Sequence, residues 1–286
     1  MNLKDNYQLN DGVEIPVIAF GTYKLPAAKE TKELVKYAIQ SGYRHIDTAS
    51  FYENEEYVGA GIKEAIAEGI VRREDIFLTT KLWTDDQGYE SAKAALDKSL
   101  NALGLDYVDL YLIHWPNPLK YRDCWQEKNA ETWQAMEEAQ AAGKIRSIGV
   151  SNFMPRHLRP LLESAKVKPS VNQIMLNPGV QQREVQTFNN KENILSTAYS
   201  PLARGEVFEI NDLADIAKKY GKTEAQIVLR WSLQHGFIPL PKSANKNRIK
   251  ENIDLFDFEL SKEDMEKIDS FEGLVGEMEN PDEKPY

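Results

Sequence analysis

The stretch YRHIDTASFYENEEYVGAGIKEAIAEG, residues 43–69, decides the fold because it holds one complete strand–loop–helix unit. Its first five residues, YRHID, read as a short strand that ends on the acid Asp47. The segment EEYVGAGIKEAIAEG then places four apolar side chains on one face of a helix: Val58, Ile62, Ala65 and Ile66. Gly69 supplies the end of that helix.

The same unit recurs along the whole chain. Eight β-rich runs, several apolar enough to be buried on both faces, are VIAFG (17–21), YRHID (43–47), IFLTTK (76–81), VDLYLIH (108–114), IRSIGV (145–150), SVNQIML (170–176), ILSTAY (194–199) and GFIPLP (236–241). Between them lie segments of helical periodicity, among them residues 29–42, 90–104, 131–143, 155–165, 212–221 and 223–236.

Alternation of strand and helix predicts a parallel sheet, and eight units in 286 residues are the size of a (β/α)8 barrel. We therefore predict an α/β protein, a (β/α)8 TIM barrel formed as a single domain over residues 1–286. A doubly wound open sheet is the alternative. The turn signal NDG at residues 10–12, between YQL and VEI, predicts a β-hairpin that covers the bottom of the barrel. The segment after residue 270 is a short, acidic C-terminal tail.

Composition excludes several classes of protein. The net charge of −10 argues against a partner that is a nucleic acid or an anionic membrane. Cys124 is the only cysteine, so no disulfide can form within the chain. The first residues, MNLKDNYQLNDG, lack an apolar signal core, and no apolar run approaches the roughly 18 residues that span a bilayer. We expect a cytoplasmic protein.

Three common kinds of site find no support in the sequence. The four histidines lack the spacing of metal ligands, so we expect no metal site. No G-x-S-x-G motif is present to support Ser-His-Asp hydrolysis. GAGIKE (59–64) lies inside a helical pattern, does not follow a strand, and carries Glu64 where a dinucleotide-binding fingerprint needs its third glycine.

Polar residues instead gather at the predicted ends of the strands. These residues are Asp47, Lys81, His114, Ser151 with Asn152, Gln173, Tyr199 and Lys242. In a barrel the carboxyl ends of all strands converge on one mouth, which is where catalytic residues lie. Tyr52 belongs to the loop above the same mouth. Any one of these side chains has an ordinary structural explanation, but an acid, a lysine and a histidine ending three successive strands favour a shared site.

Seven segments resemble the aldo-keto reductases, in order and at compatible spacing: GYRHIDTASFYENEEYVG, LTTKLW, VDLYLIHWP, GKIRSIGVSNF, VNQI, AYSPLARG and PLPKSANKNRIKEN. The similarity is greatest to the short bacterial 2,5-diketo-gluconate and glyoxal reductases. It implies a monomeric (β/α)8 barrel that binds NADP(H) without a Rossmann fold and reduces aldehydes and ketones. The implied catalytic residues are Asp47, Tyr52, Lys81 and His114. Met175, Asn177 and Ala203 depart from residues common in the family, which leaves the substrate open.

These four residue types suit hydride transfer to a carbonyl. The substrate oxygen gains negative charge and needs a proton, which Tyr52 would supply as general acid. We expect the Lys81 cation to lower the pKa of Tyr52 and Asp47 to hold Lys81 charged and aimed. A neutral His114 would donate a hydrogen bond to the substrate oxygen.

Other residues are assigned to the cofactor and the substrate. Ser151, Asn152 and Gln173 suit a carboxamide, and Tyr199 offers a face for the nicotinamide ring. We further expect cofactor contacts from Gly21, Thr22, Ser200, Leu202, Arg204, Lys242, Ser243, Arg248, Glu251 and Asn252, with Lys242, Ser243 and Arg248 at the 2′-phosphate. Tyr23, Phe51, Trp83 and Trp115, with His114, would form the wall around the substrate, a small activated carbonyl such as a glyoxal or keto-sugar. No obligate protein partner is evident.

Two other functions fit the same barrel. One is a regulatory subunit that binds the nucleotide with little turnover. The other is an isomerase or aldolase in which Lys81 forms a Schiff base with a carbonyl substrate.

Overall fold

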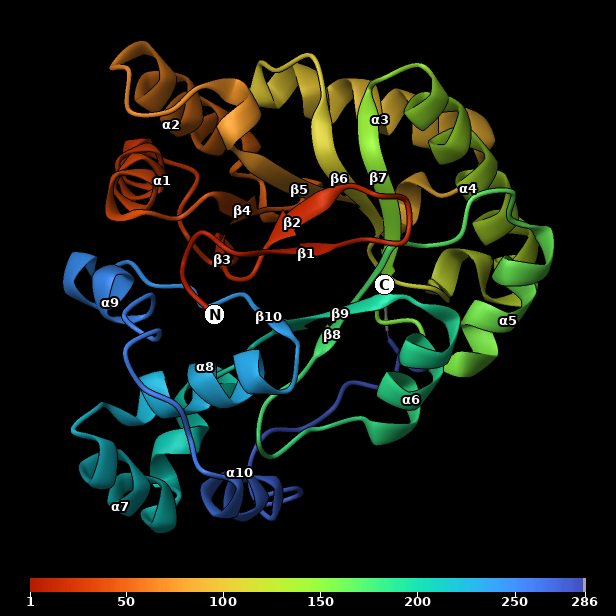
Figure 1. The fold of residues 1–286 in the computed structure, drawn as a ribbon. Helices are drawn as coiled ribbons and strands as arrows, with labels where there is room; N and C mark the ends of the chain where they lie inside the picture. The colour runs from red at the N-terminus through yellow and green to blue at the C-terminus, as the bar shows by residue number, and fades with distance from the viewer. Residues whose placement is uncertain (285–286) are drawn as a thin grey trace.

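The computed structural model describes residues 1–284, and their eight parallel strands form a barrel ringed by helices (Figure 1). The strands are β3 (Ala19–Gly21), β4 (His45–Asp47), β5 (Phe77–Leu82), β6 (Val108–Ile113), β7 (Ile145–Ser151), β8 (Val171–Met175), β9 (Leu195–Tyr199) and β10 (Ile238–Pro239). Each strand pairs with its neighbours in chain order. The backbone N–H of Gly21 donates to the carbonyl of Pro241 at 3.0 Å, which joins the first strand to the residue two places after the last. The predicted barrel is confirmed, and an open sheet is excluded.

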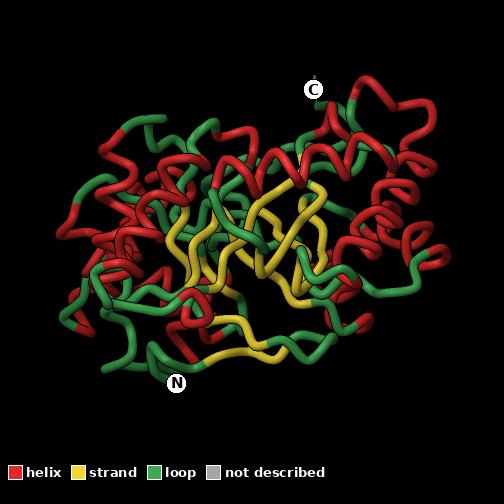
Figure 2. Tube along the Cα trace, turned by 90° about the horizontal axis from the view of Figure 1, so that it is seen from above, coloured by secondary structure: helices red, strands yellow, loops and turns green. Residues whose placement is uncertain are grey.

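The predicted hairpin lies at the bottom of this barrel (Figure 2). Strands β1 (Asn6–Gln8) and β2 (Glu14–Pro16) pair antiparallel around the NDG turn, where Gly12 adopts a φ of 87°. The Asn10 side chain donates to the carbonyls of Pro169 and Asn193, which lie two residues before the starts of β8 and β9. Ile15 packs with the apolar cluster inside the barrel and is fully buried. The hairpin therefore closes the end where strands begin and leaves open the end where they finish.

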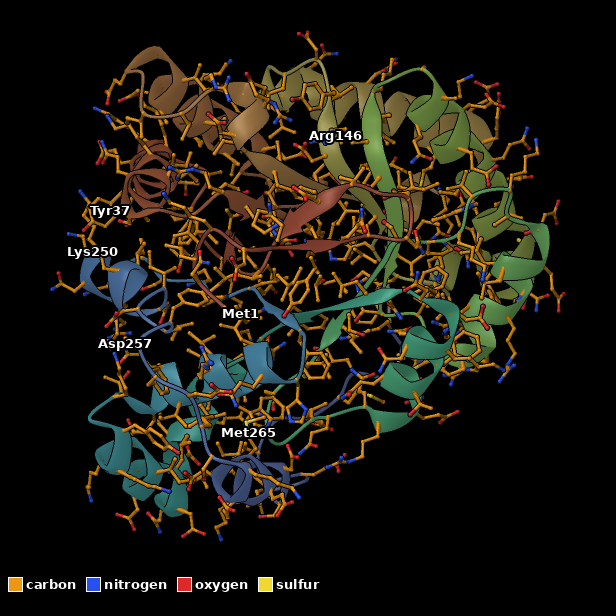
Figure 3. All side chains as sticks on the ribbon, viewed as in Figure 1. Met1, Tyr37, Arg146, Lys250, Asp257 and Met265 are labelled. Atoms are coloured by element: carbon orange, nitrogen blue, oxygen red, sulfur yellow. The ribbon has the colours of Figure 1, made fainter. Side chains whose placement is uncertain are left out.

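Helices cover the outside of the barrel. They are α1 (Lys29–Ser41), α2 (Glu55–Ala67), α3 (Tyr89–Leu103), α4 (Trp125–Ala141), α5 (Pro155–Ser164), α6 (Arg183–Glu192), α7 (Asn211–Tyr220), α8 (Glu224–Gln234), α9 (Lys246–Glu251) and α10 (Lys262–Asp269). Periodicity does not reveal α6, because only Val185 and Phe188 of its ten residues are buried apolar side chains. Helix α9 lies against α1, where the Lys250 ammonium sits 5.9 Å from the centre of the Tyr37 ring (Figure 3).

The glycines of GAGIKE serve packing between helices. A Cβ at Gly59 would overlap the carbonyl of Leu103 at the end of α3. A Cβ at Gly61 would meet the carbonyl of Lys32 at 2.7 Å and the side chain of Val35 in α1. Helix α2 can approach both neighbours closely only because these positions lack side chains. The rejection of a dinucleotide fingerprint here is consistent with this packing role.

None of the helices over residues 1–284 combines the length and apolar character that crossing a membrane requires.

Candidate active site

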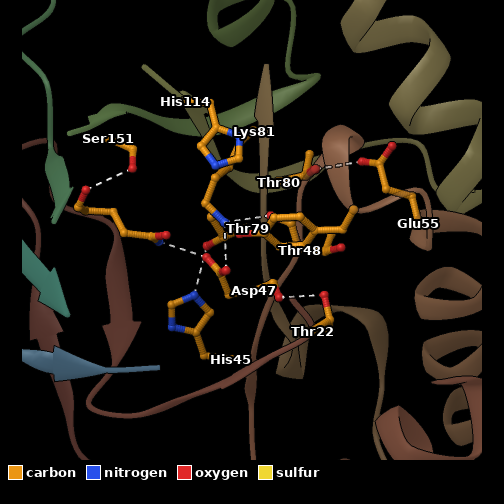
Figure 4. Close-up of polar contacts among 12 residues, drawn as sticks. Thr22, His45, Asp47, Thr48, Glu55, Thr79, Thr80, Lys81, His114 and Ser151 are labelled. Atoms are coloured by element: carbon orange, nitrogen blue, oxygen red, sulfur yellow. Dashed lines mark hydrogen bonds and ion pairs between the residues drawn. The ribbon is translucent and has the colours of Figure 1, made fainter. Parts of the chain in front are cut away.

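Lys81 and Asp47 form a buried ion pair at the open end of the barrel. Asp47 is the last residue of β4, and Lys81 is the penultimate residue of β5. The Lys81 ammonium lies 2.7 Å from Oδ1 of Asp47, donates to the Thr48 carbonyl at 2.8 Å, and is 3.3 Å from the hydroxyl of Tyr52 (Figure 4). The Lys81 side chain is fully buried. These three contacts use all three ammonium hydrogens and fix the direction of Nζ.

The short turn between β4 and α2 positions Tyr52. A 3₁₀ turn over Ser50–Tyr52 carries the ring to the mouth, where it is half-buried and lies 5.0 Å from the Tyr23 ring and 6.0 Å from the His114 ring, measured between centroids. The Ser50 hydroxyl donates to the Lys81 carbonyl at 3.0 Å and ties the turn to β5. Tyr52 is thus placed by bonds to the strand that carries Lys81.

The protonation of this group differs from our expectation. We predicted that Lys81 lowers the pKa of Tyr52, but burial raises it well above its usual value, and the nearby Asp47 carboxylate adds to the rise. Burial also lowers the pKa of Lys81, opposed by Asp47. The main cause of the difference is desolvation of the phenol by burial, which disfavours its charged form. The Lys81 cation does not offset this effect, because it is already paired with Asp47. Tyr52 is therefore a protonated phenol at neutral pH, which is the state that a proton donor requires.

His114 directly follows β6 and faces the same cavity. Burial lowers its pKa well below the usual range, and the Lys81 cation adds to the effect, so the ring is neutral. Its Nδ1 atom is buried and makes no hydrogen bond within residues 1–284. The His114 and Trp83 rings pack in a T-shaped arrangement, with centroids 5.3 Å apart and an interplanar angle of 79°. The structure thus supplies the neutral histidine that the sequence predicts.

The next three strand ends form a hydrogen-bonded shelf. The Ser151 hydroxyl donates to the Gln173 carbonyl at 2.9 Å, and the Asn152 amide donates to the His114 carbonyl at 3.0 Å. The Tyr199 hydroxyl donates to Oδ1 of Asn152 at 2.8 Å. The Gln173 amide donates to Oδ2 of Asp47 at 2.8 Å. The shelf is therefore bonded to the ion pair and not merely adjacent to it.

All of this opens into a cavity of about 490 Å³. Predicted residues that line it are Gly21, Asp47, Tyr52, His114, Ser151, Asn152, Gln173, Tyr199, Ser200, Leu202, Arg204, Lys242 and Arg248, together with Tyr23, Phe51, Trp83 and Trp115. The rings of Phe51 and Trp83 stack with centroids 3.8 Å apart. Residues from nearly every strand end thus share one pocket, whose lining includes the catalytic candidates, aromatic rings and the cations Arg204, Lys242 and Arg248.

Five predicted site residues do not line this cavity: Thr22, Lys81, Ser243, Glu251 and Asn252. Lys81 lies beneath it, behind Tyr52. Thr22 is fully buried, and its hydroxyl donates to the Asp47 carbonyl at 3.0 Å. Ser243 accepts a hydrogen bond from the Asn245 backbone, and Glu251 accepts one from Thr223, the N-cap residue of α8. Asn252 is buried. The structure therefore gives these side chains intramolecular contacts or burial in place of a position on the cavity wall.

Sequence reasoning missed other residues of the site. Lys24, Pro201, Gly205, Phe208, Leu240, Pro241 and Glu279 also line the cavity. Asn54 supports it from behind, because its amide donates to the carbonyls of Thr22 and Leu25 while its oxygen accepts from Thr48. A buried asparagine shortly after Tyr52 carries no distinctive pattern. Only Lys24 offered a signal, as a lysine three residues after the end of β3 and beside Tyr23.

The C-terminal tail crosses the rim. Asp282 accepts hydrogen bonds from Asn117 at 2.8 Å, from Nε of Arg156 at 2.7 Å and from Nε2 of His157 at 2.8 Å. Burial opposes ionisation of this carboxyl, but these donors hold its pKa at about 2. Nδ1 of His157 accepts from the Met154 backbone, so Nε2 carries the proton in the neutral ring. This anchor brings Glu279 into the cavity wall, where it pairs with Arg204 at 3.3 Å.

Across residues 1–284, the His, Cys, Asp and Glu side chains form no group of three or more that could hold a metal ion.

Comparisons with known proteins agree with this geometry. Residues 17–272 match the model of the Aldo/keto reductase family. A glyoxal reductase of Bacillus subtilis is 48% identical over 282 residues, which cover 99% of this chain and 98% of that protein. The crystal structure of a Bombyx mori aldo-keto reductase in complex with NADP is 40% identical, covers 94% of this chain and 93% of that one, and has a TM-score of 0.85. A mutant of the protein Gox0644 in complex with NADPH is 39% identical, covers 99% of each chain and has a TM-score of 0.90.

Proposed function

This chain belongs to the aldo/keto reductase family, and on that premise we propose that it is an NADP-dependent oxidoreductase that reduces aldehydes and ketones to alcohols. The observation that carries the proposal is the buried Lys81 ammonium, which bridges Asp47 and the hydroxyl of Tyr52 beside a neutral His114. The proton donor Tyr52, the Lys81 cation and the hydrogen-bond donor His114 then converge where a carbonyl oxygen would gain charge.

The cavity suits the cofactor at both ends. Near the ion pair, the amides of Asn152 and Gln173 and the ring of Tyr199 line its wall. At the far end, the exposed side chains of Lys242 and Arg248 line it. An amide shelf with an aromatic ring fits a nicotinamide, and free cations fit a 2′-phosphate. When bound, NADPH supplies the hydride, and the chain supplies orientation and the proton.

Tyr52 is the proton donor in this proposal. Its raised pKa keeps the phenol protonated before the reaction. As charge develops on the substrate oxygen, the proton moves from Tyr52 to that oxygen, and the phenolate left behind faces the Lys81 ammonium at 3.3 Å. Asp47 keeps Lys81 in place for that moment. Lys81 therefore stabilises the phenolate as it forms during the reaction. It does not keep Tyr52 deprotonated before the reaction.

The contacts of Lys81 favour this positioning role over a Schiff base. A lysine that attacks a carbonyl needs a free, neutral amine at the substrate. Nζ of Lys81 is engaged by Asp47, Thr48 and Tyr52, and the residue does not line the cavity. We expect borohydride to trap no carbonyl substrate on Lys81.

The proposed substrates are small activated carbonyls, such as glyoxals, short aldehydes and keto-sugars. Support comes from the similarity to a glyoxal reductase and from a wall of aromatic rings over a cavity of about 490 Å³. Of the tail residues that the structure describes, up to 284, only Glu279 belongs to the lining. A substrate panel with a sharp preference for one bulky steroid-like ketone would count against this assignment.

The test is loss of NADPH absorbance when methylglyoxal is added, with Tyr52→Phe as the matched variant. The substitution removes one hydroxyl and keeps the ring, so kcat should fall by a factor of about 10²–10⁴. The Kd for NADPH, measured by fluorescence titration, should stay unchanged. Near-normal turnover by Tyr52→Phe would sink the proposal, as would an enzyme that consumes no NADPH with any member of the carbonyl panel.

A further inference from the structure

One hydrogen bond joins opposite sides of the barrel mouth. Gln173 lies on β8 and Asp47 on β4, and in the sheet order three strands separate β8 from β4 along β7, β6 and β5. The barrel closes from β3 to β10, so three strands also separate them the other way. Nε2 of Gln173 nevertheless reaches Oδ2 of Asp47 at 2.8 Å. The contact spans the full width of the mouth.

This bond completes the fixing of Asp47. Lys81 binds Oδ1 of the carboxylate and Gln173 binds Oδ2, so both oxygens are held from different strands. Only 3% of the surface of either Asp47 or Gln173 is exposed. With one oxygen free, the carboxylate could rotate about its side chain and carry Lys81 with it. With both oxygens bonded, Asp47 directs Lys81 at Tyr52 in a single geometry.

The charge of Asp47 also determines which way the amide of Gln173 points. An ionised carboxylate only accepts hydrogen bonds, so the NH2 of Gln173 must face Asp47 and its oxygen must face away. Gln173 lines the cavity beside Ser151 and Asn152, where the proposed carboxamide would lie. The same side chain therefore touches the cofactor shelf with one end and the proton-transfer residues with the other.

From this arrangement we infer that Gln173 is a positioning residue for the proton donor, acting through Asp47 and Lys81, in addition to its expected contact with the nicotinamide. The inference rests on the proposed function for its catalytic consequence. Its structural basis, the unit of Gln173, Asp47 and Lys81, exists in the protein without a cofactor and is tested there first.

The first test measures unfolding by urea of the cofactor-free protein in a double-mutant cycle of Gln173→Leu and Lys81→Met. Both changes act through Asp47, so the unfolding constant of the double variant should differ from the product of the single effects by at least about twofold. Gln173→Leu combined with Glu64→Gln is the control, because Glu64 pairs with Lys32 and Lys36 on the outside of the barrel. Additive effects in both cycles would overturn the inference, whether or not the protein is a reductase.

The second test separates positioning from cofactor binding by measuring kcat at saturating NADPH across pH. Gln173→Leu should lower kcat about tenfold, the lower range for losing a hydrogen bond to a charged group. A carboxylate that loses a donor takes up a proton more readily, so the acid limb of the profile should move to higher pH. Asn152→Ala is the comparison: it should raise the Kd for NADPH and leave the acid limb in place. A Gln173→Leu enzyme that behaves like Asn152→Ala would overturn the inference.

If the Gln173→Leu variant does not fold, Gln173→Glu takes its place, because a glutamate side chain keeps the shape of glutamine. A glutamic acid can donate to Asp47 only when it carries a proton. The ratio of the variant's kcat to the wild-type kcat should therefore rise as the pH falls. A ratio that stays constant with pH would show that the bond to Asp47 does not position the proton donor.

Discussion

The two ends of the cavity are built in opposite ways. At the proposed proton-transfer end, Lys81 is fully buried and has three partners within the chain, and Asp47 is held at both oxygens. At the proposed phosphate end, Lys242 and Arg248 are exposed, and neither forms an ion pair with any carboxylate of residues 1–284. Chemistry requires groups placed to within a fraction of an ångström, whereas attraction of a phosphate works through a field and tolerates movement. The fold fixes the first end and leaves the second available to a ligand.

The largest expected effect comes from breaking the buried ion pair. Lys81→Met leaves the Asp47 carboxylate buried without its cation, which typically costs about 3–5 kcal/mol. The free energy of unfolding, measured with urea, should fall by that order. Lys242→Met is the matched control at the other end and should change stability by less than about 0.5 kcal/mol, as an exposed substitution does. If both variants unfold alike, the two ends do not differ as described.

Cofactor choice tests the phosphate end directly. Arg248→Ala removes one charge-assisted contact of about 1.5–3 kcal/mol, so the Kd for NADPH should rise about tenfold to a hundredfold. NADH lacks the 2′-phosphate and should lose much less affinity. Fluorescence titration with both cofactors at fixed salt makes the comparison, and kcat at saturating NADPH should be unchanged. Equal losses for NADPH and NADH would show that Arg248 does not contact the 2′-phosphate.

The sequence predicts the order of strands in the barrel and the residues at their ends, but not the hydrogen bonds between the side chains of the site. All eight strands lie in β-rich runs of the sequence, and Asp47, Lys81 and His114 stand at the ends of three of them. The motifs also bring Tyr52 to the same mouth. The bond from Gln173 to Asp47 is not predictable, because it depends on side-chain reach between strands 126 positions apart in the chain. Glu279 and helix α6 escape notice for a related reason, since neither carries an apolar period or a family motif.

Acid stability should reveal the buried end. His45 is buried against Thr79, and burial near the Lys81 cation lowers its pKa to about 3. An unfolded histidine has a pKa of about 6.5, so between these values the unfolded state binds more protons. The contribution of neutral, buried His45 to the free energy of unfolding is therefore fully present above about pH 6.5. It falls by up to about 1.4 kcal/mol per pH unit as the pH drops toward 3.

His45→Gln should lessen this loss, because an amide can still bond Thr79 without titrating. Urea unfolding at pH 7 and pH 5 gives the slope for the wild type and the variant. His114 titrates in the same direction, so some dependence should remain in the variant. Identical slopes would mean that His45 is not held neutral by burial.

The smallest effect concerns the tail. Glu279 pairs with Arg204 at the cavity wall and would compete with a pyrophosphate for that cation. Exposed ion pairs are worth about 0.2–1 kcal/mol, so Glu279→Gln should tighten NADPH binding by at most about fivefold. Glu277→Gln removes the same charge two residues away without a bond to Arg204. Weaker binding by Glu279→Gln would show that the carboxylate supports the loop and does not compete.

We propose that the chain itself fixes the end of the cavity around Lys81 and that the cofactor orders the end around Lys242 and Arg248. Amide hydrogen exchange with and without NADPH tests this contrast most directly. The backbone amides of Thr48 and His114 donate to carbonyls of β5 at 2.9 and 3.1 Å, and that of Tyr52 donates to Ala49 within its own turn at 3.0 Å. Peptides around them should therefore exchange slowly in both states. Peptides over residues 199–209 and 241–252 should gain protection only when NADPH is bound. Protection gained instead around Asp47, Tyr52 and Lys81, with no change near Lys242 and Arg248, would contradict the account.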